Sequence, residues 1–246
     1  MYEEILGQPD KLRYLILQGG EPLLIPETED ILDYLIEHDC AGHVTLEIVS
    51  NMTTLEPSTL EKLKRFARVE LGGSIDGIGE TLEYIRYPAK WPEIEENLQR
   101  AKTAPNIRIQ FNVAVQAYNL LDVPNLLSYC QRNGYEICVH FLVGPYYLSV
   151  LTMPLSVRDL AAARVRQFIA DGCSPAVRSA ADTVLNYLDQ HRTIERREML
   201  RDFMLFTNDM DRSRGQSFPQ AQGELYRHIL DSGFEWTDEI LHARGN

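Results

Sequence analysis

Polar residues suited to binding a small ligand recur along the first half of this chain, each just after a run of apolar residues. They are Gly20 with Glu21, Ser50 with Asn51, Ser74 with Asp76, and Asn119. Each also has an ordinary explanation, because Ser, Asn and Asp-Gly sequences are common in turns. In an α/β sheet, however, ligands bind at the carboxyl ends of the strands. The recurrence of polar groups at successive strand ends therefore favours one shared binding rim.

The turn from Gly19 to Pro22 is the most informative of these motifs. It follows the apolar residues 15–17, which predict a strand buried on both faces. The paired glycines allow a sharp turn that exposes backbone amides and carbonyls. Glu21 then lies at the end of the strand, where its carboxylate would bind a positively charged group. A tight strand-to-helix turn with a solvated glutamate is the alternative.

Composition narrows the class of protein. With 246 residues, 44% of them apolar and 24% charged, the chain is typical of one large α/β domain, with or without a smaller appendage. We expect a cytoplasmic protein without membrane contact, because no apolar run reaches about 18 residues and Met1–Ile5 lacks a signal-peptide pattern. A net charge of −12 argues against nucleic-acid partners. A small-molecule or peptide substrate is expected instead.

Residues 1–145 alternate between strand and helix patterns. After the first strand, further strands are predicted at residues 44–49, 69–75, 107–115 and 137–143. Thr28 is predicted to cap one intervening helix, and Ser58 to Glu61 forms a capping-box pattern for another. This alternation predicts a parallel sheet with right-handed crossovers, either open or curled into a partial barrel.

Residues 146–246 have a different character. Helices are predicted at residues 155–170, 176–188 and 193–206, with no strong strand pattern among them. We therefore divide the chain into an α/β core at 1–145 and a mostly helical extension at 146–246.

The four cysteines have no short repeated spacing, so they predict neither a zinc site nor a disulfide framework. They are Cys40, Cys130, Cys138 and Cys173. Cys130 falls on the apolar face of a helix pattern and Cys138 in an apolar strand pattern. Both are expected to be buried free thiols.

Taken in order, the motifs of residues 10–145 closely resemble those of radical S-adenosylmethionine (radical SAM) enzymes. The match comprises Gly19-Gly20-Glu21-Pro22, Ser50-Asn51 and Ser74-Ile75-Asp76-Gly77 after three successive strands, followed by Arg86 and the helix at Trp91. The peptide- and protein-modifying branch is the most similar. The segment from Phe206 to Phe218 is also similar to one found in members with a short "twitch" extension. The resemblance implies an α/β fold: a partial (β/α)6 TIM-like barrel that lacks its first strand, with a mostly helical C-terminal extension.

The resemblance also implies a SAM site. The Gly19 to Pro22 turn would contact the methionyl amino group of SAM. Ser50 and Asn51 would lie near its ribose or methionyl part. Ser74 and Asp76 would bind the ribose hydroxyls or the methionyl carboxylate. Arg86 would bind the methionyl carboxylate. Val115 and Val143 would flank the adenine. The full set of implied SAM-binding residues is Gly19, Gly20, Glu21, Pro22, Ser50, Asn51, Ser74, Asp76, Arg86, Val115, Asn119 and Val143. No catalytic residue is assigned.

One feature of the family is missing. Its members hold a [4Fe-4S] cluster with three closely spaced cysteines upstream of the glycine turn. A flavodoxin or ferredoxin reduces the cluster, which then cleaves SAM to a radical that attacks the substrate. Here no cysteine precedes Leu15, and the cysteines present are too scattered to substitute. Two explanations remain: an open reading frame that begins late, which we favour, or a true variant without a cluster. In either case we expect an inactive chain whose first strand has an unpaired edge.

Two other functions remain open beside a radical SAM enzyme acting on a peptide or protein. The chain could be a cluster-less protein that binds SAM, a nucleotide or a peptide without radical catalysis. It could also be an unrelated α/β enzyme that uses Glu21 and Asp76 as acid and base, although two carboxylates on neighbouring strand ends are far from sufficient for that assignment.

Overall fold

The computed structural model describes residues 7–194 and 196–239. It divides into two compact units, the first made of Met1–Ser74 and Lys90–Phe111 and the second of Ile75–Ala89 and Asn112–Asn246. Within the described residues, no helix combines the length and the apolar character needed to cross a bilayer. Met1–Ile5, from which we expected no signal peptide, lie outside the described residues.

The strands form one five-stranded sheet in the order β1-β2-β3-β4-β5, which confirms the predicted α/β class and is compatible with a partial barrel. Their bounds are β1 Tyr14–Leu17, β2 Thr45–Ser50, β3 Arg68–Ser74, β4 Ile107–Val115 and β5 Glu136–Phe141. The strands are parallel, and Leu46 of β2 lies between Leu15 of β1 and Val69 of β3. Every strand end is therefore followed by a loop at the same edge, as parallel pairing requires.

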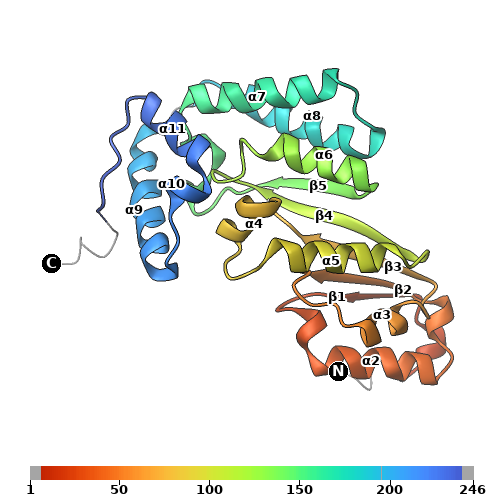
Figure 1. Cartoon of the computed structure of the whole chain (residues 1–246). Coiled ribbons are helices and arrows are strands. Elements are labelled where there is room, and N and C mark those ends of the chain that lie inside the picture. The colour runs from red at the N-terminus through yellow and green to blue at the C-terminus, as the bar shows by residue number, and fades with distance from the viewer. Residues whose placement is uncertain (1–6, 195, 240–246) are drawn as a thin grey trace. The chain divides into compact units, whose positions relative to one another are not determined.

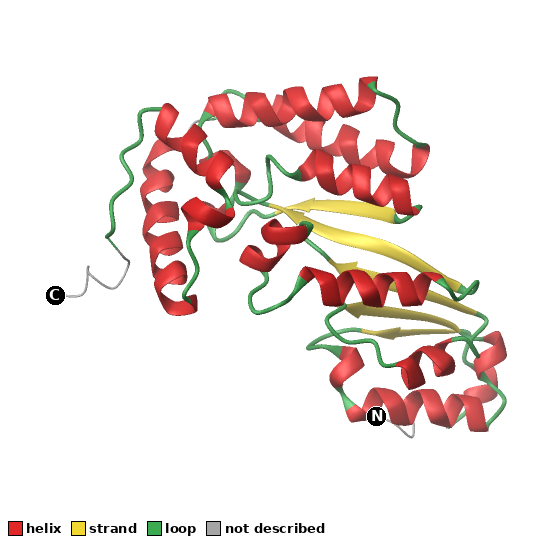
Figure 2. Ribbon diagram, in the orientation of Figure 1, coloured by secondary structure: helices red, strands yellow, loops and turns green. Residues whose placement is uncertain are grey.

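The first unit contains β1, β2, β3 and the start of β4, with helices packed against them (Figure 2). The helices are α2 Pro26–Glu37, α3 Pro57–Leu63 and α5 Trp91–Lys102, with short 3-10 turns at η1 Pro9–Lys11, η2 Pro22–Leu24 and η3 Ala41–His43. Helices α2 and α3 lie side by side (Figure 1), and Lys62 Nζ of α3 donates to Asp33 Oδ2 of α2 at 2.8 Å. The core includes Leu35, Ile48 and Leu98, which have no exposed surface.

The second unit contains the end of β4, β5 and the remaining helices. These are α4 Gly79–Ile85, α6 Val123–Asn133, α7 Leu155–Ala170, α8 Pro175–Gln190, α9 Arg197–Arg214, α10 Phe218–Ala221 and α11 Gly223–Asp231, with 3-10 turns at η4 Tyr146–Leu148 and η5 Val150–Thr152. Among the described residues after Gly144, all regular elements are helical, as predicted. Helices α6, α7 and α8 pack together (Figure 1).

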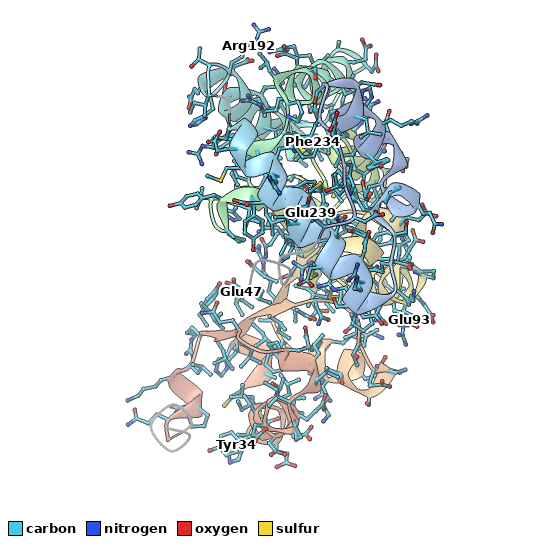
Figure 3. All side chains as sticks on the ribbon, turned by 90° about the vertical axis from the view of Figure 1, so that its left-hand side faces the viewer. Tyr34, Glu47, Glu93, Arg192, Phe234 and Glu239 are labelled. Carbon is cyan, nitrogen blue, oxygen red and sulfur yellow. The ribbon has the colours of Figure 1, made fainter. Side chains whose placement is uncertain are left out.

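The chain after α11 returns along α9. Figure 3 shows Phe234 and Glu239 in this stretch beside α9. Asn208 Nδ2 of α9 donates to the carbonyl oxygens of Thr237 and Glu239, both at 2.6 Å. The Trp236 ring stacks on Phe218 with a centroid separation of 5.1 Å. The stretch thereby closes an aromatic core between α9 and α10.

The burial predicted for the first strand is wrong. Tyr14 is 48% exposed and Ile16 46% exposed, because β1 lies at the edge of the sheet and pairs with β2 alone among the described strands. The unpaired edge expected for this strand is found within the described residues. Burial of a strand on both faces depends on its neighbours, which the apolar run does not specify.

The two predicted helix caps are also wrong. Helix α2 begins at Pro26, with Ile25 as its N-cap, so that Thr28 is buried within the first turn. Helix α3 begins at Pro57, and Ser58 lies inside it. In both cases a proline at the first helical position decides where the helix begins, because its fixed φ suits that position and its missing N–H costs nothing there.

Other differences concern helix length and burial. Helix α9 extends to Arg214, well beyond the predicted end at residue 206, and no helix is predicted where α4, α10 and α11 form. Cys130 is buried as predicted, and burial raises the pKa of its thiol to about 12. Cys138, predicted to be buried, is half-exposed on β5. The division into 1–145 and 146–246 stays a prediction.

Helix α6 offers a test of how the chain turns toward β5. Gly134 ends the helix with φ at +70°, and the amide of Tyr135 donates to Cys130 O at 2.9 Å. We expect Gly134→Ala to lower the free energy of unfolding by about 1 kcal/mol, because a Cβ strains the left-handed backbone. Gly42→Ala is the matched control, since Gly42 has an ordinary φ and open space around it. Equal urea denaturation midpoints for the two variants would contradict this account.

Candidate functional site

In the first unit, the Glu21 carboxylate joins the loop after β1 to the loop after β2. Gly19 and Gly20 have φ of +96° and +57°, which turns the chain sharply before Glu21. Glu21 Oε2 accepts a hydrogen bond from the Asn51 amide at 2.7 Å, and Oε1 accepts from the Leu23 amide at 3.4 Å. We call this arrangement of Gly19, Gly20, Glu21, Ser50 and Asn51 the Glu21 cluster.

The loop after β2 is held by its own side chains. Ser50 Oγ accepts from the Met52 amide at 2.9 Å, and Asn51 Oδ1 accepts from the Thr53 amide at 2.8 Å. Met52 is fully buried with φ at +61°, and its carbonyl oxygen accepts from Asn97 Nδ2 at 2.8 Å. The Asn51 Nδ2 donor makes no hydrogen bond to the described part of the chain, so it stays available to a ligand.

In the second unit, Asp76 and Arg86 form an ion pair after the end of β3. Asp76 is 4% exposed, and its Oδ2 accepts from Arg86 Nε at 2.8 Å and from Nη2 at 2.7 Å. Its Oδ1 accepts from the Ala114 amide at 2.7 Å. The carboxylate therefore fastens the loop after β3 to β4 and orients the half-buried guanidinium of Arg86.

Asn119 completes this arrangement, which we call the Asp76 cluster: Asp76, Arg86 and Asn119. Asn119 Nδ2 donates to Asp76 O at 2.7 Å and to Ala114 O at 2.9 Å, while its Oδ1 accepts from the Gln116 amide at 2.8 Å. Asn119 is buried, and each of its polar atoms has a backbone partner. It positions the loops after β3 and β4.

The remaining predicted residues lie at or near strand ends. Pro22 is buried at the start of η2, and Ser74 is the half-buried last residue of β3. Val115, the last residue of β4, is fully buried, whereas Val143 beyond β5 is 67% exposed. The structure thus brings Glu21 together with Asn51 in one unit and Asp76 together with Arg86 and Asn119 in the other.

These contacts define the chemistry that each cluster can perform. Both carboxylates accept hydrogen bonds with both oxygens, as ionised carboxylates do, which weighs against using Glu21 and Asp76 as an acid–base pair. Arg86 retains exposed surface and can donate charge-assisted hydrogen bonds to an anionic group. The Glu21 turn presents backbone and carboxylate oxygens to a cationic group.

Sequence reasoning missed a second set of residues around a cavity in the second unit. Tyr84, Gln116, Tyr118 and Arg214 contribute its polar atoms. Gln116 directly follows β4, just as Asn51 directly follows β2. The strand-end rule applied to Asn51 therefore also identifies Gln116.

The cysteines do not form a site for an iron–sulfur cluster. Cys40 and Cys130 are buried, and Cys138 and Cys173 are half-buried. Within residues 7–194 and 196–239, no group of three or more His, Cys, Asp or Glu side chains is arranged to hold a metal ion. A [4Fe-4S] cluster needs several thiolates at one point. The residues present here do not fit that group.

Solved structures that share this fold include those of SuiB and anSMEcpe. SuiB of Streptococcus suis bound to S-adenosylmethionine matches at 16% identity and a TM-score of 0.51, over 69% of this chain and 40% of SuiB. Native anSMEcpe with bound AdoMet matches at 15% identity and a TM-score of 0.51, over 70% of this chain and 52% of that protein. The chain thus spans about half of the length of these proteins or less, and at such identity the likeness concerns the fold alone.

The sequence of this chain matches the profile of a protein family. A search of curated proteins finds no match. The profile of the radical SAM superfamily matches residues 2–130, which is more than half of the chain and includes both clusters. The chain belongs to the radical SAM superfamily.

Proposed function

We propose that this chain binds SAM in a radical SAM enzyme of the peptide- and protein-modifying branch. The Glu21 cluster is the observation that carries this proposal. Its two left-handed glycines and its carboxylate form a fixed turn at a strand end, where α/β proteins bind ligands. Family membership and the SAM bound to SuiB and anSMEcpe, which share the fold, support the choice of ligand.

Each cluster is assigned its own contribution to SAM binding. The oxygens of the Gly19 to Pro22 turn would accept hydrogen bonds from the methionyl ammonium, and Asn51 Nδ2 would donate to a hydroxyl or carboxylate oxygen. Arg86 would pair with the methionyl carboxylate. Ser50, Ser74, Asn119 and the fully buried Val115 would support these loops, and Val143 would contribute apolar surface for the adenine.

Asp76 has a narrower role in this proposal than the family resemblance implies. Both of its oxygens already accept hydrogen bonds from Arg86 and Ala114. We therefore assign it to orienting Arg86 rather than to direct contact with a ribose hydroxyl. Loss of its charge would release the guanidinium from its position.

The proposal assigns binding and no radical step to this chain, because its cysteines do not fit a cluster. A peptide or protein is the proposed substrate, a flavodoxin or ferredoxin the proposed reductant, and the cytoplasm the proposed location. A cluster-less protein that binds SAM or a nucleotide is the second candidate, and the scattered cysteines favour it.

Calorimetric titration with SAM tests the proposal. We expect the unmodified chain to bind SAM, and Glu21→Gln and Asp76→Asn each to weaken binding at least about tenfold, which corresponds to about 1.4 kcal/mol. Glu21→Gln loses the charge that faces the ammonium. Asp76→Asn loses the acceptor that holds Arg86, and this change also lowers the free energy of unfolding by about 2 kcal/mol.

Asp182→Asn is the matched control, because Asp182 pairs with Arg178 at 2.8 Å on the exposed face of α8. Its effect on SAM binding should be absent and its effect on stability at most about 0.5 kcal/mol. Circular dichroism at the titration temperature verifies that each variant is folded. No heat with the unmodified chain, or unchanged heats in both cluster variants, would remove the proposed site.

Anaerobic reconstitution with iron and sulfide separates the chain's own capacity for a cluster from its SAM binding. We expect no stoichiometric iron–sulfur chromophore, because the thiols are dispersed and partly buried. A variant with all four cysteines replaced by serine is the control for adventitious iron. An absorbance band present in the original chain and lost in that variant would contradict this expectation.

A further inference from the structure

The second unit contains a cavity of about 330 Å³, which we call the Gln116 cavity. Its walls come from α4, the loops after β4 and β5, and the last turns of α9. The lining residues used below are Tyr84, Gln116, Tyr118, Phe206, Met210 and Arg214. Its volume lies at the lower end of the range of about 300–1,000 Å³ that is typical of ligand sites. Most of the wall is aromatic or aliphatic.

Gln116 is the polar residue of this wall whose side chain has no hydrogen-bond partner in the described part of the chain and is not fully enclosed by protein atoms. The residue is 6% exposed, and its backbone amide is held by Asn119 Oδ1 at 2.8 Å. Its side-chain carboxamide makes no hydrogen bond to the part of the chain that the structure describes. A carboxamide offers a donor and an acceptor side by side, which complements a peptide group. A ligand that supplies a peptide group would satisfy this donor and this acceptor together.

The other polar groups of the wall are already engaged. Tyr84 OH donates to Asp211 Oδ1 at 2.9 Å, and Tyr118 OH shares a hydrogen bond of 2.7 Å with Thr207 Oγ1. Asp211 Oδ2 accepts from the Phe218 amide at 2.6 Å. These bonds close the wall and leave it apolar toward the cavity.

Arg214 supplies a positive charge at the rim. Its Nη1 contacts the Tyr84 carbonyl oxygen at 3.4 Å, and its guanidinium carbon lies 5.7 Å from the centre of the Tyr87 ring. It forms no ion pair with any residue in the described ranges. A guanidinium held by a weak hydrogen bond and an aromatic ring keeps its planar donor face for a carboxylate.

We propose that the Gln116 cavity binds one residue of a peptide substrate, so this inference rests on the peptide substrate of the proposed function. The apolar side chain of that residue lies against Phe206 and Met210. Gln116 hydrogen-bonds to its peptide group, and Arg214 pairs with a carboxylate of the same peptide. That carboxylate is either the peptide's C-terminus or a neighbouring acidic side chain.

Four synthetic peptides distinguish these sources in calorimetric titrations of the full chain. The first peptide is acetyl-Gly-Gly-Phe with a free C-terminus, and the second is acetyl-Gly-Phe-Glu-Gly-amide. The third is acetyl-Gly-Phe-Gln-Gly-amide, which lacks the acidic side chain. The fourth is acetyl-Gly-Gly-Glu-Gly-amide, which lacks the apolar side chain. We expect one of the first two to bind at least about tenfold more tightly than the third and the fourth. Equal binding of all four, or of none, would overturn the proposal.

Variants of the chain test the two polar contacts. Arg214→Gln should weaken the preferred peptide about tenfold, to the level of the uncharged one, and Gln116→Leu should weaken it by a similar factor. The controls are Arg212→Gln and Gln220→Leu, which change exposed residues of the same types outside the cavity. If Gln116→Leu binds the peptide as well as the unmodified chain, the peptide-group contact is excluded.

Two further readouts keep the test decisive. Gln116→Leu should not lower the urea denaturation midpoint, because the Gln116 side chain has no hydrogen bond to the described part of the chain to lose, so that weaker binding cannot be attributed to unfolding. Peptide binding is measured without SAM. Failure of the peptides to bind while SAM binds overturns only the cavity proposal, whereas peptide binding without SAM binding overturns only the SAM assignment.

Discussion

The buried carboxylate of Asp76 holds together the functional loops of the second unit. It accepts the Ala114 amide of β4 with one oxygen and the guanidinium of Arg86 with the other. Asn119 extends this contact, because it donates to the Asp76 carbonyl oxygen and accepts the amide of Gln116. A single connected network therefore sets the positions of Arg86 and of the Gln116 backbone. Because Asp76 and Asn119 are buried and each of their side-chain polar atoms is hydrogen-bonded, removal of one disturbs the other members.

The first unit uses the same device in a more exposed form. Glu21 reaches from one strand-end loop to the amide of Asn51 in the next loop, at 2.7 Å. Parallel strands have no short hairpin between their ends, so the loops need cross-links of this kind to keep a fixed conformation. In both units, a carboxylate that looks like a ligand-binding group in the sequence first stabilises the loops. Besides the oxygens of the Gly19 to Pro22 turn, the groups left for a ligand are the donors that these carboxylates position.

The sequence predicts the parts of this structure that depend on local pattern. The bounds of β4 and α7 match the predicted ones, because periodicity is a local property of the sequence. The exposure of Tyr14 could not be predicted, since it depends on how many strands flank β1. The pairing of Asp76 with Arg86 was missed for a related reason. The sequence indicates that both residues follow β3, but not that the chain between them turns one toward the other.

The satisfied and the unsatisfied polar groups carry different information about function. Asp76, Arg86 and Asn119 have structural partners, so their arrangement is explained by folding even in a protein that performs no chemistry. The carboxamide of Gln116 lines a cavity and has no hydrogen-bond partner in the part of the chain that the structure describes. Folding therefore gives this carboxamide no structural role, whereas a ligand in the cavity would supply its missing partners. The Gln116 cavity is therefore the stronger structural indication that this chain binds a ligand, and the Asp76 cluster explains how the loop after β4 keeps its conformation.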